Sequence, residues 1–583
     1  MACVRLLLDF VTQLKERQQD LLARLPEDSP LAKQLEEITP SLVLAKAALE
    51  KQAWLAEGFS LPLQIAVVGP TQAGKSSLVN LLLGREVAEV SPLAGFTVHP
   101  QAFLHVPLLE EGRTPLPWEV IERFFTGFKA CKVKDLPKDR YDCFGIKEVV
   151  GVTPLPPCVV WDTPDFDSLR AKKYLNAVLL TAALADLLVV VVSKDKYADQ
   201  SVFDFLALVE ELKQPTLVVI NKVPSGSTEL LRRSFADKWR KVRKDPCPQV
   251  LTLEYIDSGR VNAFAEQVFK ALLPLCAKAR PSHMGAIGLV RRCFREWSAP
   301  IRAEIEAQKT LLALTKDALD SALNLYRTDF LDHPVMYETL KKLCLKLLAL
   351  LEIPILARPM MVIRRTLTWP FKALSRRLPR GEKEVKELFI LQRAVEHALL
   401  KLKASIRDQI HLSPLKHFWQ EIEVKLTART PSLLEEFKAD SLIYTLAFEP
   451  KIEAAALQLY QRLQDSPAAL NSLRAARAGT DVAGLSLLFH TGGIGPHDVV
   501  LAPAMLSLTS MLTEKALKLY LERVVEELKR EQLKEVKALL YRFADKIVQE
   551  IQVDPPLSFG ISESLLSQVE EELRERPYGL KLF

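Results

Sequence analysis

Residues Gly69 to Ser76 read GPTQAGKS, which has the residue types and spacing of a loop that binds phosphate. The backbone N–H groups of such a loop, and of the helix that follows, form a cradle for an anion. Lys75 adds a positive charge that reaches β and γ phosphates, and the Ser76 hydroxyl is suited to ligate Mg²⁺. We therefore expect phosphate binding by Gly69, Pro70, Thr71, Gln72, Ala73, Gly74, Lys75, Ser76 and Ser77.

Two residues farther along the chain are candidates to support a metal ion. Asp162 ends the apolar run CVVWD, and a carboxylate at the tip of a buried strand commonly holds Mg²⁺ indirectly. A turn or helix-capping aspartate is the alternative. Thr97 lies in the turn-rich stretch SPLAGFTVHP and could be a switch residue ordered by a γ-phosphate and Mg²⁺, or a simple loop threonine. The expected cofactor is Mg²⁺, held by Ser76, Thr97 and, indirectly, Asp162.

A sheet is needed to bring these residues together, and the sequence predicts one. Short apolar runs alternate with helical patterns; they are LQIAVVG (63–69), PCVVWD (157–162), DLLVVVV (186–192), PTLVVIN (215–221) and QVLTLEYI (249–256). Continuous Val, Ile and Leu runs indicate strands buried on both faces of a mostly parallel sheet with helices on both sides. We predict N-terminal helices (bundle or neck) over 1–58, an α/β domain over 59–280 and a large all-α, stalk-like region over 281–583.

The tetrapeptide Asn221-Lys222-Val223-Pro224 follows the strand TLVVI, where its first two side chains would brace the phosphate loop and stack on a base. In order and spacing, GPTQAGKS, Thr97, DTPD (162–165) and NKVP resemble the P-loop GTPases of the translation-factor-related class. Within that class the chain is most similar to dynamin-like GTPases, including bacterial ones, because helices precede the domain and a long helical region follows it. The motifs cover 63–260; the helical remainder is similar only in architecture.

This resemblance implies a P-loop G domain that binds GTP and GDP and hydrolyses GTP. It also implies coupling of nucleotide state to self-assembly or membrane association through the helical stalk, with dimers or homo-oligomers formed through the G domain or the stalk. Beyond the phosphate loop, the nucleotide-binding residues that it implies are Asp162, Asp165, Asn221, Lys222 and Ser258.

The chain departs from the family pattern at several positions. Asp165 stands where the family has glycine, so its carboxylate opposes a phosphate unless it points away. Pro224 replaces the aspartate that reads guanine, which leaves ATP or relaxed specificity open. Phe166 replaces the glutamine that is catalytic in the family. The catalytic candidates are therefore Gln72, Lys75 and Thr97. The alternative for Gln72 is a solvated residue at the tip of the loop without a catalytic role. These departures leave a further hypothesis for the function, a nucleotide-binding scaffold that hydrolyses nucleotide at a negligible rate.

Two segments of the helical region suggest contact with a membrane. Residues 353–381 carry seven basic and no acidic residues among aromatic and apolar ones, so with a net charge of +6 the rest of the chain sums to −1. This composition favours an anionic lipid surface. A solvated basic helix face and an RNA-contacting patch, as in an RNA- or ribosome-binding switch, are the alternatives. Residues 482–513 are nearly uncharged and form either a membrane-dipping hairpin or a hairpin buried in the helical core.

Composition limits the remaining classes of protein. Apolar residues make up 49% and charged residues 26% of the 583, which excludes a mainly disordered or collagen-like chain. The sequence has no long uninterrupted apolar run and its start does not resemble a signal peptide. Eight scattered cysteines without a CxxC pair favour reduced thiols. We therefore expect a cytoplasmic protein. Its association with lipid would be peripheral, at the inner face of the membrane.

Overall fold

The computed structural model describes residues 2–574 apart from 91–96, 108–117, 126, 138–139, 141, 152, 167–170, 225, 255–260, 280–284, 334–336, 351–385, 466, 468–469, 471–514 and 556. Ser258 and the segments 353–381 and 482–513 lie outside the described residues. The chain divides into two compact units, one of Met1–Ile305 with Asp554–Phe583 and one of Glu306–Val553.

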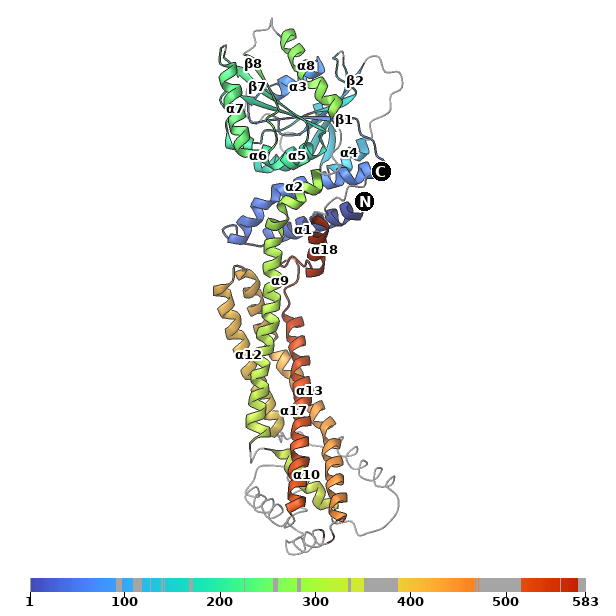
Figure 1. Cartoon of the computed structure of the whole chain (residues 1–583), viewed down its shortest axis with the longest axis vertical. Helices are drawn as coiled ribbons and strands as arrows, with labels where there is room; N and C mark the ends of the chain where they lie inside the picture. Colours follow the sequence, from blue (N-terminus) through green and yellow to red (C-terminus); the bar gives the residue numbers. More distant parts are fainter. Residues whose placement is uncertain are drawn as a thin grey trace, which may run out of the picture. The chain divides into compact units, whose positions relative to one another are not determined.

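The first unit contains an eight-stranded sheet (Figure 1). Its strands are β1 (Leu63–Val68), β2 (Gln101–Pro107), β3 (Lys129–Lys132), β4 (Cys143–Gly151), β5 (Cys158–Asp162), β6 (Leu187–Ser193), β7 (Thr216–Val223) and β8 (Gln249–Glu254). They lie in the order β3-β4-β2-β5-β1-β6-β7-β8. Only β2 and β5 pair antiparallel; every other pair is parallel. The predicted fold class, a mostly parallel α/β sheet followed by a large helical region, is confirmed.

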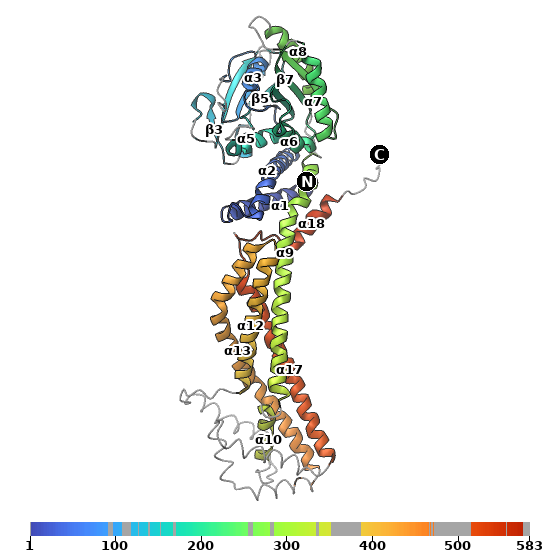
Figure 2. The same cartoon turned by 90° about the vertical axis from the view of Figure 1, so that its left-hand side faces the viewer.

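All five strands predicted from continuous apolar runs are present, as β1, β5, β6, β7 and β8. The sequence did not predict β2, β3 and β4, which extend the sheet beyond β5. Strand β3 is only four residues long at the sheet edge, and β4 carries Gly145, Lys147 and Glu148, so neither has a continuous apolar run. Figure 2 shows β3 at one side of the sheet and β7 with α7 at the other.

Helices cover both faces of the sheet. They are α3 (Lys75–Leu83), α4 (Trp118–Phe124), α5 (Ala171–Leu184), α6 (Gln200–Val209), α7 (Thr228–Val242) and α8 (Val261–Lys278), with short 3-10 turns at Val133–Asp135 and Glu210–Leu212. Helices α3 and α8 lie on one side, and α5 and α6 on the other (Figure 1). Leu78 and Leu82 of α3 and Val268 of α8 share one core cluster with Val67 and Val191 of the strands. This core fixes the start of α3 at the end of β1.

The N-terminal helices α1 (Ala2–Leu22) and α2 (Pro30–Ala56) pack in the same unit as the sheet. Buried Lys51 of α2 donates to the carbonyls of Leu184 (2.6 Å) and Ala185 (3.0 Å) and to Asp186 Oδ1 (2.7 Å). Asp186 Oδ2 accepts from the backbone N–H of Gln64 at 2.9 Å. This buried ion pair therefore ties α2 to the beginning of β1 and the end of α5.

Segments from far along the chain complete this unit. Helix α9 (Gly285–Tyr326) begins here, and its Trp297 Nε1 donates to Ser41 Oγ of α2 at 2.9 Å. Glu304 of α9 accepts from Ser558 Oγ (2.6 Å) and from the Phe559 N–H (3.0 Å), just before α18 (Glu563–Leu573). The first compact unit therefore includes the beginning of α9 and the segment that carries α18.

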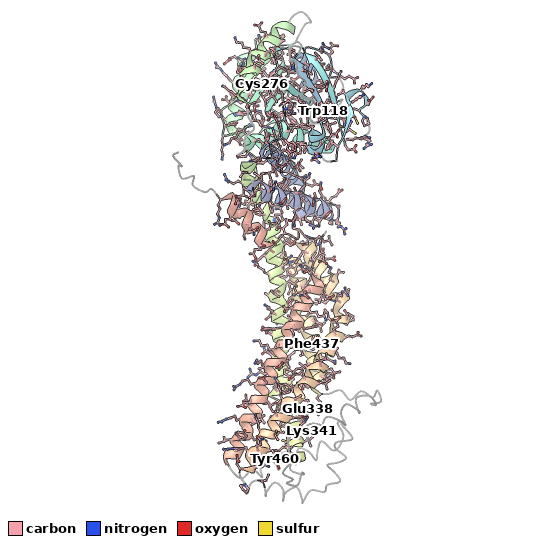
Figure 3. All side chains as sticks on the ribbon, turned by 90° about the vertical axis from the view of Figure 1, so that its right-hand side faces the viewer. Trp118, Cys276, Glu338, Lys341, Phe437 and Tyr460 are labelled. Atoms are coloured by element: carbon pink, nitrogen blue, oxygen red, sulfur yellow. The ribbon has the colours of Figure 1, made fainter. Side chains whose placement is uncertain are left out.

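The second unit consists of helices. After α9 and a π-helical turn, Arg327–Leu331, come α10 (Glu338–Leu350), α12 (Lys386–Leu412), α13 (Lys416–Gln464) and α17 (Lys515–Ile551). Phe437 of α13, labelled in Figure 3, packs its ring against Phe543 of α17, with centroids 4.9 Å apart. Among the described residues, no helix has the length and apolar character needed to cross a membrane.

A buried carboxylate joins four helices of this unit. Glu387 of α12 accepts hydrogen bonds from Tyr326 of α9 (2.8 Å), Tyr444 of α13 (3.1 Å) and Gln532 of α17 (2.9 Å). Its exposed fraction is 5%, and burial raises the pKa of its carboxyl group. Because all three partners donate to the same carboxylate oxygen, loss of the Glu387 side chain would deprive three buried donors of this acceptor.

Candidate functional site

The loop between β1 and α3 depends on two glycines. Gly74 has a φ of +97°, and a Cβ there would lie 2.3 Å from Asn221 Nδ2. A Cβ on Gly69 would lie 2.0 Å from the Val191 carbonyl oxygen of β6. The backbone can therefore approach β6 and Asn221 only because these side chains are absent. Lys75 and Ser76 then begin α3, where the free N–H groups of the first turn are available to an anion.

Ser76 and Asp162 meet at the edge of the sheet. Parallel pairing of β1 with β5 sets Val67 opposite Asp162, and Ser76 Oγ donates to Asp162 Oδ2 at 2.6 Å. Asp162 is fully buried, and this burial is the main reason that its pKa is raised to about 6; hydrogen bonding from Ser76 and the charge of Lys75 act in the opposite direction. Asp162 Oδ1 is buried and accepts no hydrogen bond from the described residues.

This pair fits a Mg²⁺ ion. The hydroxyl and the carboxylate are hard oxygen ligands of the kind that Mg²⁺ prefers, and Mg²⁺ commonly keeps several waters. The unpartnered Oδ1 is a buried acceptor that a metal-bound water can donate to. No group of three or more His, Cys, Asp or Glu suited to hold a metal occurs among the described residues.

Lys75 lies in a buried set of acceptors. Its ammonium group donates to the carbonyl oxygens of Gly69 and Pro70, both at 3.1 Å, and forms an ion pair with Asp165 Oδ1. The side chains of Lys75 and Asp165 are only 5% and 9% exposed. Asp165 therefore does not point away from the phosphate loop: its carboxylate contacts the lysine that was expected to bind phosphate.

Asn221 and Lys222, at the end of β7, both contact the phosphate loop. Asn221 Nδ2 donates to the Ala73 carbonyl (3.0 Å), and Lys222 Nζ donates to the Gln72 carbonyl (2.8 Å). Lys222 and Gln72 both have left-handed backbones, with φ of 58° and 60°. The bracing contacts expected from NKVP are present, and they hold the exposed Gln72 in a conformation that few non-glycine residues adopt.

The other predicted residues are less closely associated with the loop. Thr97 is half-buried in the loop before β2, and no hydrogen bond between described residues joins it to Ser76 or Asp162. Phe166 stacks on Phe205 of α6, with centroids 5.1 Å apart. Pro224 is exposed. Ser77 is exposed in the first turn of α3, and Thr71 is buried.

Sequence reasoning missed one anchor of the site. Thr163 is fully buried, and its Oγ1 donates to the Val67 carbonyl of β1 at 2.8 Å. With Phe166 held against Phe205, this bond fixes both sides of Asp165. Its only sequence signal is its position, directly after a strand that ends in aspartate.

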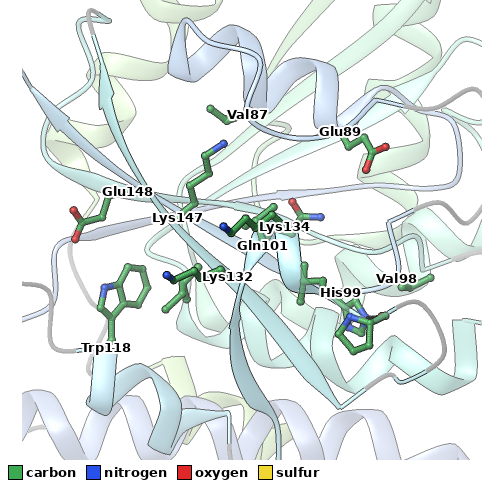
Figure 4. Close-up of a pocket in the computed structure, with 14 residues that line it drawn as sticks. Val87, Glu89, Val98, His99, Gln101, Trp118, Lys132, Lys134, Lys147 and Glu148 are labelled. Atoms are coloured by element: carbon green, nitrogen blue, oxygen red, sulfur yellow. Dashed lines mark hydrogen bonds between the residues drawn. The ribbon is translucent and has the colours of Figure 1, made fainter.

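A separate cavity of about 700 Å³ lies on the part of the domain formed by β2, β3 and β4 (Figure 4). Its lining includes Lys132, Lys134, Lys147 and Trp118, together with Glu89 and Glu148. None of the phosphate-loop residues lines it, so it is distinct from the site built by Lys75, Ser76 and Asp162.

Comparison with known proteins gives the domain its class. Residues 64–222 match the family described as "50S ribosome-binding GTPase". A stretch of 77 residues is 44% identical to the tRNA modification GTPase MnmE of Pelagibacter ubique (strain HTCC1062), covering 12% of this chain. The chain spans only 16% of the length of that relative.

Solved structures are similar at low identity. The chain resembles one of "an oligomerised bacterial dynamin pair" (12% identity, 94% of this chain and 96% of that one, TM-score 0.34). It also resembles the bacterial selenocysteine-specific elongation factor EF-Sec (10% identity, 37% and 29%, TM-score 0.22). TM-scores this low do not establish a shared arrangement of the whole chain. The family match and the loop between β1 and α3 identify residues 64–222 as a P-loop GTPase domain.

Proposed function

We propose that the protein binds GTP and GDP with Mg²⁺ at the phosphate loop and hydrolyses GTP. The observation that carries this proposal is the Ser76–Asp162 hydrogen bond beside a buried acceptor, Asp162 Oδ1, that has no described partner. An acidic group that is buried with a raised pKa costs stability, and such groups are typical of functional sites. A bound cation would offset that cost.

The residues around the phosphate loop would have different roles in phosphoryl transfer. Ser76 and, through water, Asp162 would hold Mg²⁺, with Thr97 closing on it; the ion would neutralise charge that develops on the phosphates. Lys75 and the N–H groups at the start of α3 would orient the phosphate chain. The bracing of the loop by Asn221 and Lys222 keeps those N–H groups in place without a reorganisation cost at the moment of reaction.

Positioning of the attacking water is assigned to Gln72. Phe166, at the position where the family has glutamine, is only 8% exposed and is stacked on Phe205, so it presents no polar group to a water molecule. Gln72 is exposed at the tip of the phosphate loop, and its backbone is fixed through Lys222. Gln72→Ala is expected to lower phosphate release at least tenfold with little change in GTP affinity.

Binding and turnover test the proposal together. We expect Mg²⁺-dependent binding of a fluorescent GTP analogue and phosphate release by the full chain. Lys75→Ala and Ser76→Ala should each lower both, whereas Lys241→Ala, at an exposed position of α7, should lower neither. No binding by the wild-type chain would contradict the proposal. Tight GTP binding without phosphate release would instead support the hypothesis of a nucleotide-binding scaffold with negligible hydrolysis, which Asp165 and Phe166 favour.

Association with an anionic membrane is a second proposal, and it rests on sequence. The +7 charge of 353–381, with Trp369 and Phe371 among its apolar residues, suits a peripheral protein at the inner, cytoplasmic face of a membrane. Nucleotide-dependent self-association, through the G domain or the helical unit, would couple the two activities. Self-association can be measured by sedimentation velocity of the full chain with GDP and with a non-hydrolysable GTP analogue. We expect a larger species with the analogue than with GDP.

Liposome sedimentation separates lipid from RNA as the partner. We expect the full chain to sediment with vesicles containing anionic lipid and to remain in solution with neutral ones. A variant with Arg364, Arg365, Arg376 and Arg377 changed to Gln should lose this binding. The matched control changes four exposed arginines, Arg233, Arg240, Arg407 and Arg530, and alters net charge equally. Binding to RNA but not to vesicles would favour the ribosome- or RNA-binding alternative that the family's description suggests.

A further inference from the structure

Lys75 is fully occupied by acceptors of the protein itself. An ammonium group has three protons to donate, and here its partners are the Gly69 carbonyl, the Pro70 carbonyl and the Asp165 carboxylate. In P-loop proteins this lysine reaches the β and γ phosphates. The Asp165 carboxylate therefore occupies the place at Lys75 that a phosphate oxygen takes when nucleotide binds.

Asp165 is held at this place from both sides. Two residues before it, Thr163 is bonded to the β1 backbone, and one residue after it, Phe166 is stacked on Phe205. Asp162 is itself part of β5, paired with Val67. A carboxylate on so short and so firmly anchored a segment remains near the phosphates even after its bond to Lys75 breaks.

We propose that Asp165 is a specificity-determining residue for the phosphate chain, and that its charge makes the site favour a nucleoside diphosphate over a triphosphate. The inference rests on the proposed nucleotide site. Either nucleotide must displace the carboxylate from Lys75. A γ-phosphate brings further negative charge to the Lys75 end of the chain, so repulsion by a buried, weakly screened Asp165 is larger for the triphosphate. The site is therefore expected to hold the diphosphate more tightly than the triphosphate.

The test is the ratio of GTP to GDP affinity, measured with Mg²⁺ by titration of fluorescent GTP and GDP analogues into the full chain. Asp165→Asn keeps the shape and an acceptor for Lys75 but removes the charge. We expect this variant to bind GTP at least tenfold more tightly, with a smaller gain for GDP, so that the ratio shifts toward GTP. Asp165→Glu keeps the charge and should keep the wild-type preference.

Two further variants show whether the charge at position 165 causes the change in the ratio of GTP to GDP affinity. Asp237→Asn removes the same charge from an exposed position of α7 and should leave the ratio unchanged. Asp165→Gly serves as the second variant if Asp165→Asn unfolds, because glycine is compatible with a loop and also removes the charge. Binding of both nucleotides with an unchanged ratio in the Asn and Gly variants overturns this inference alone. Absence of any nucleotide binding by the wild type and the variants overturns the proposed function and this inference with it.

Discussion

Removal of the Asp162 charge is expected to stabilise the protein while abolishing its function. In Asp162→Asn the side chain keeps its shape and an oxygen that can accept from Ser76 Oγ, but it cannot ionise. Burial raises the pKa of the wild-type carboxyl from 3.8 to about 6. A raised pKa means that the folded state holds the proton more tightly than the unfolded state, so ionisation at neutral pH costs folding free energy.

The size and pH dependence of this cost follow from the shift. About two pKa units at 1.36 kcal/mol each give a cost of about 3 kcal/mol at pH 7.5. The cost falls to about half at pH 5 and vanishes below the unfolded-state pKa, because both states then keep the proton. The amide group introduced by Asp162→Asn would leave its buried N–H donors short of partners, so we expect the variant to gain between about 1 and 3 kcal/mol at pH 7.5.

Urea denaturation without nucleotide or Mg²⁺ measures this prediction, since denaturation midpoints report the stability difference between variants. The wild type and Asp162→Asn are compared at pH 7.5 and pH 5.0. Asp237→Asn, at an exposed position of α7, is the control whose stability should change little. A variant that is less stable at pH 7.5, or a gain that is the same at both pH values, would refute the reasoning. Mg²⁺-dependent nucleotide binding by the variant should be lost.

Three other substitutions test the elements that position the site and the helical unit. Lys51→Met leaves Asp186 buried without its cation and should lower the free energy of urea unfolding by about 3–5 kcal/mol, against less than about 1 kcal/mol for Arg5→Met in an exposed ion pair. Gly69→Ala places a Cβ against the Val191 carbonyl and should weaken nucleotide binding at least tenfold in a fluorescence titration. Gly58→Ala strains the backbone at a φ of +89° but adds a Cβ with nothing within 4 Å of it, so it should leave nucleotide binding unchanged. Glu387→Ala should lower the unfolding free energy by more than about 3 kcal/mol, because buried tyrosine and glutamine donors lose their acceptor, and Glu387→Gln should lower it by less than about 1 kcal/mol.

The parts of the fold that could be predicted are those whose cause is local. The five strands with continuous apolar runs and the phosphate loop follow from residues within a few positions of one another. Strands β2 and β4 were missed because polar residues, such as His105 in β2 and Lys147 in β4, interrupt their apolar runs. Helix α13 continues from Lys416 to Gln464 through Pro431 and Pro450. Tertiary packing can maintain a helix across a proline that lowers its intrinsic stability.

The contact between Asp165 and Lys75 was not predictable. Sequence placed Asp165 near the phosphates but left its direction open. Its partner Lys75 lies 90 residues earlier, and their meeting depends on the pairing of β1 with β5, the Thr163 bond and the stacking of Phe166 on Phe205. The contacts of Asn221 and Lys222, in contrast, follow from a motif whose position after a strand fixes where its side chains lie.

Competition between GTP and ATP tests the central claim most directly. A fluorescent GTP analogue bound to the full chain with Mg²⁺ is displaced by unlabelled GTP, GDP or ATP, and the same titration is made with Lys75→Ala. The account predicts displacement by GTP and GDP at concentrations at least tenfold lower than by ATP, and loss of binding in the variant. Equal displacement by ATP, or binding that survives Lys75→Ala, would contradict a guanine nucleotide site at this loop.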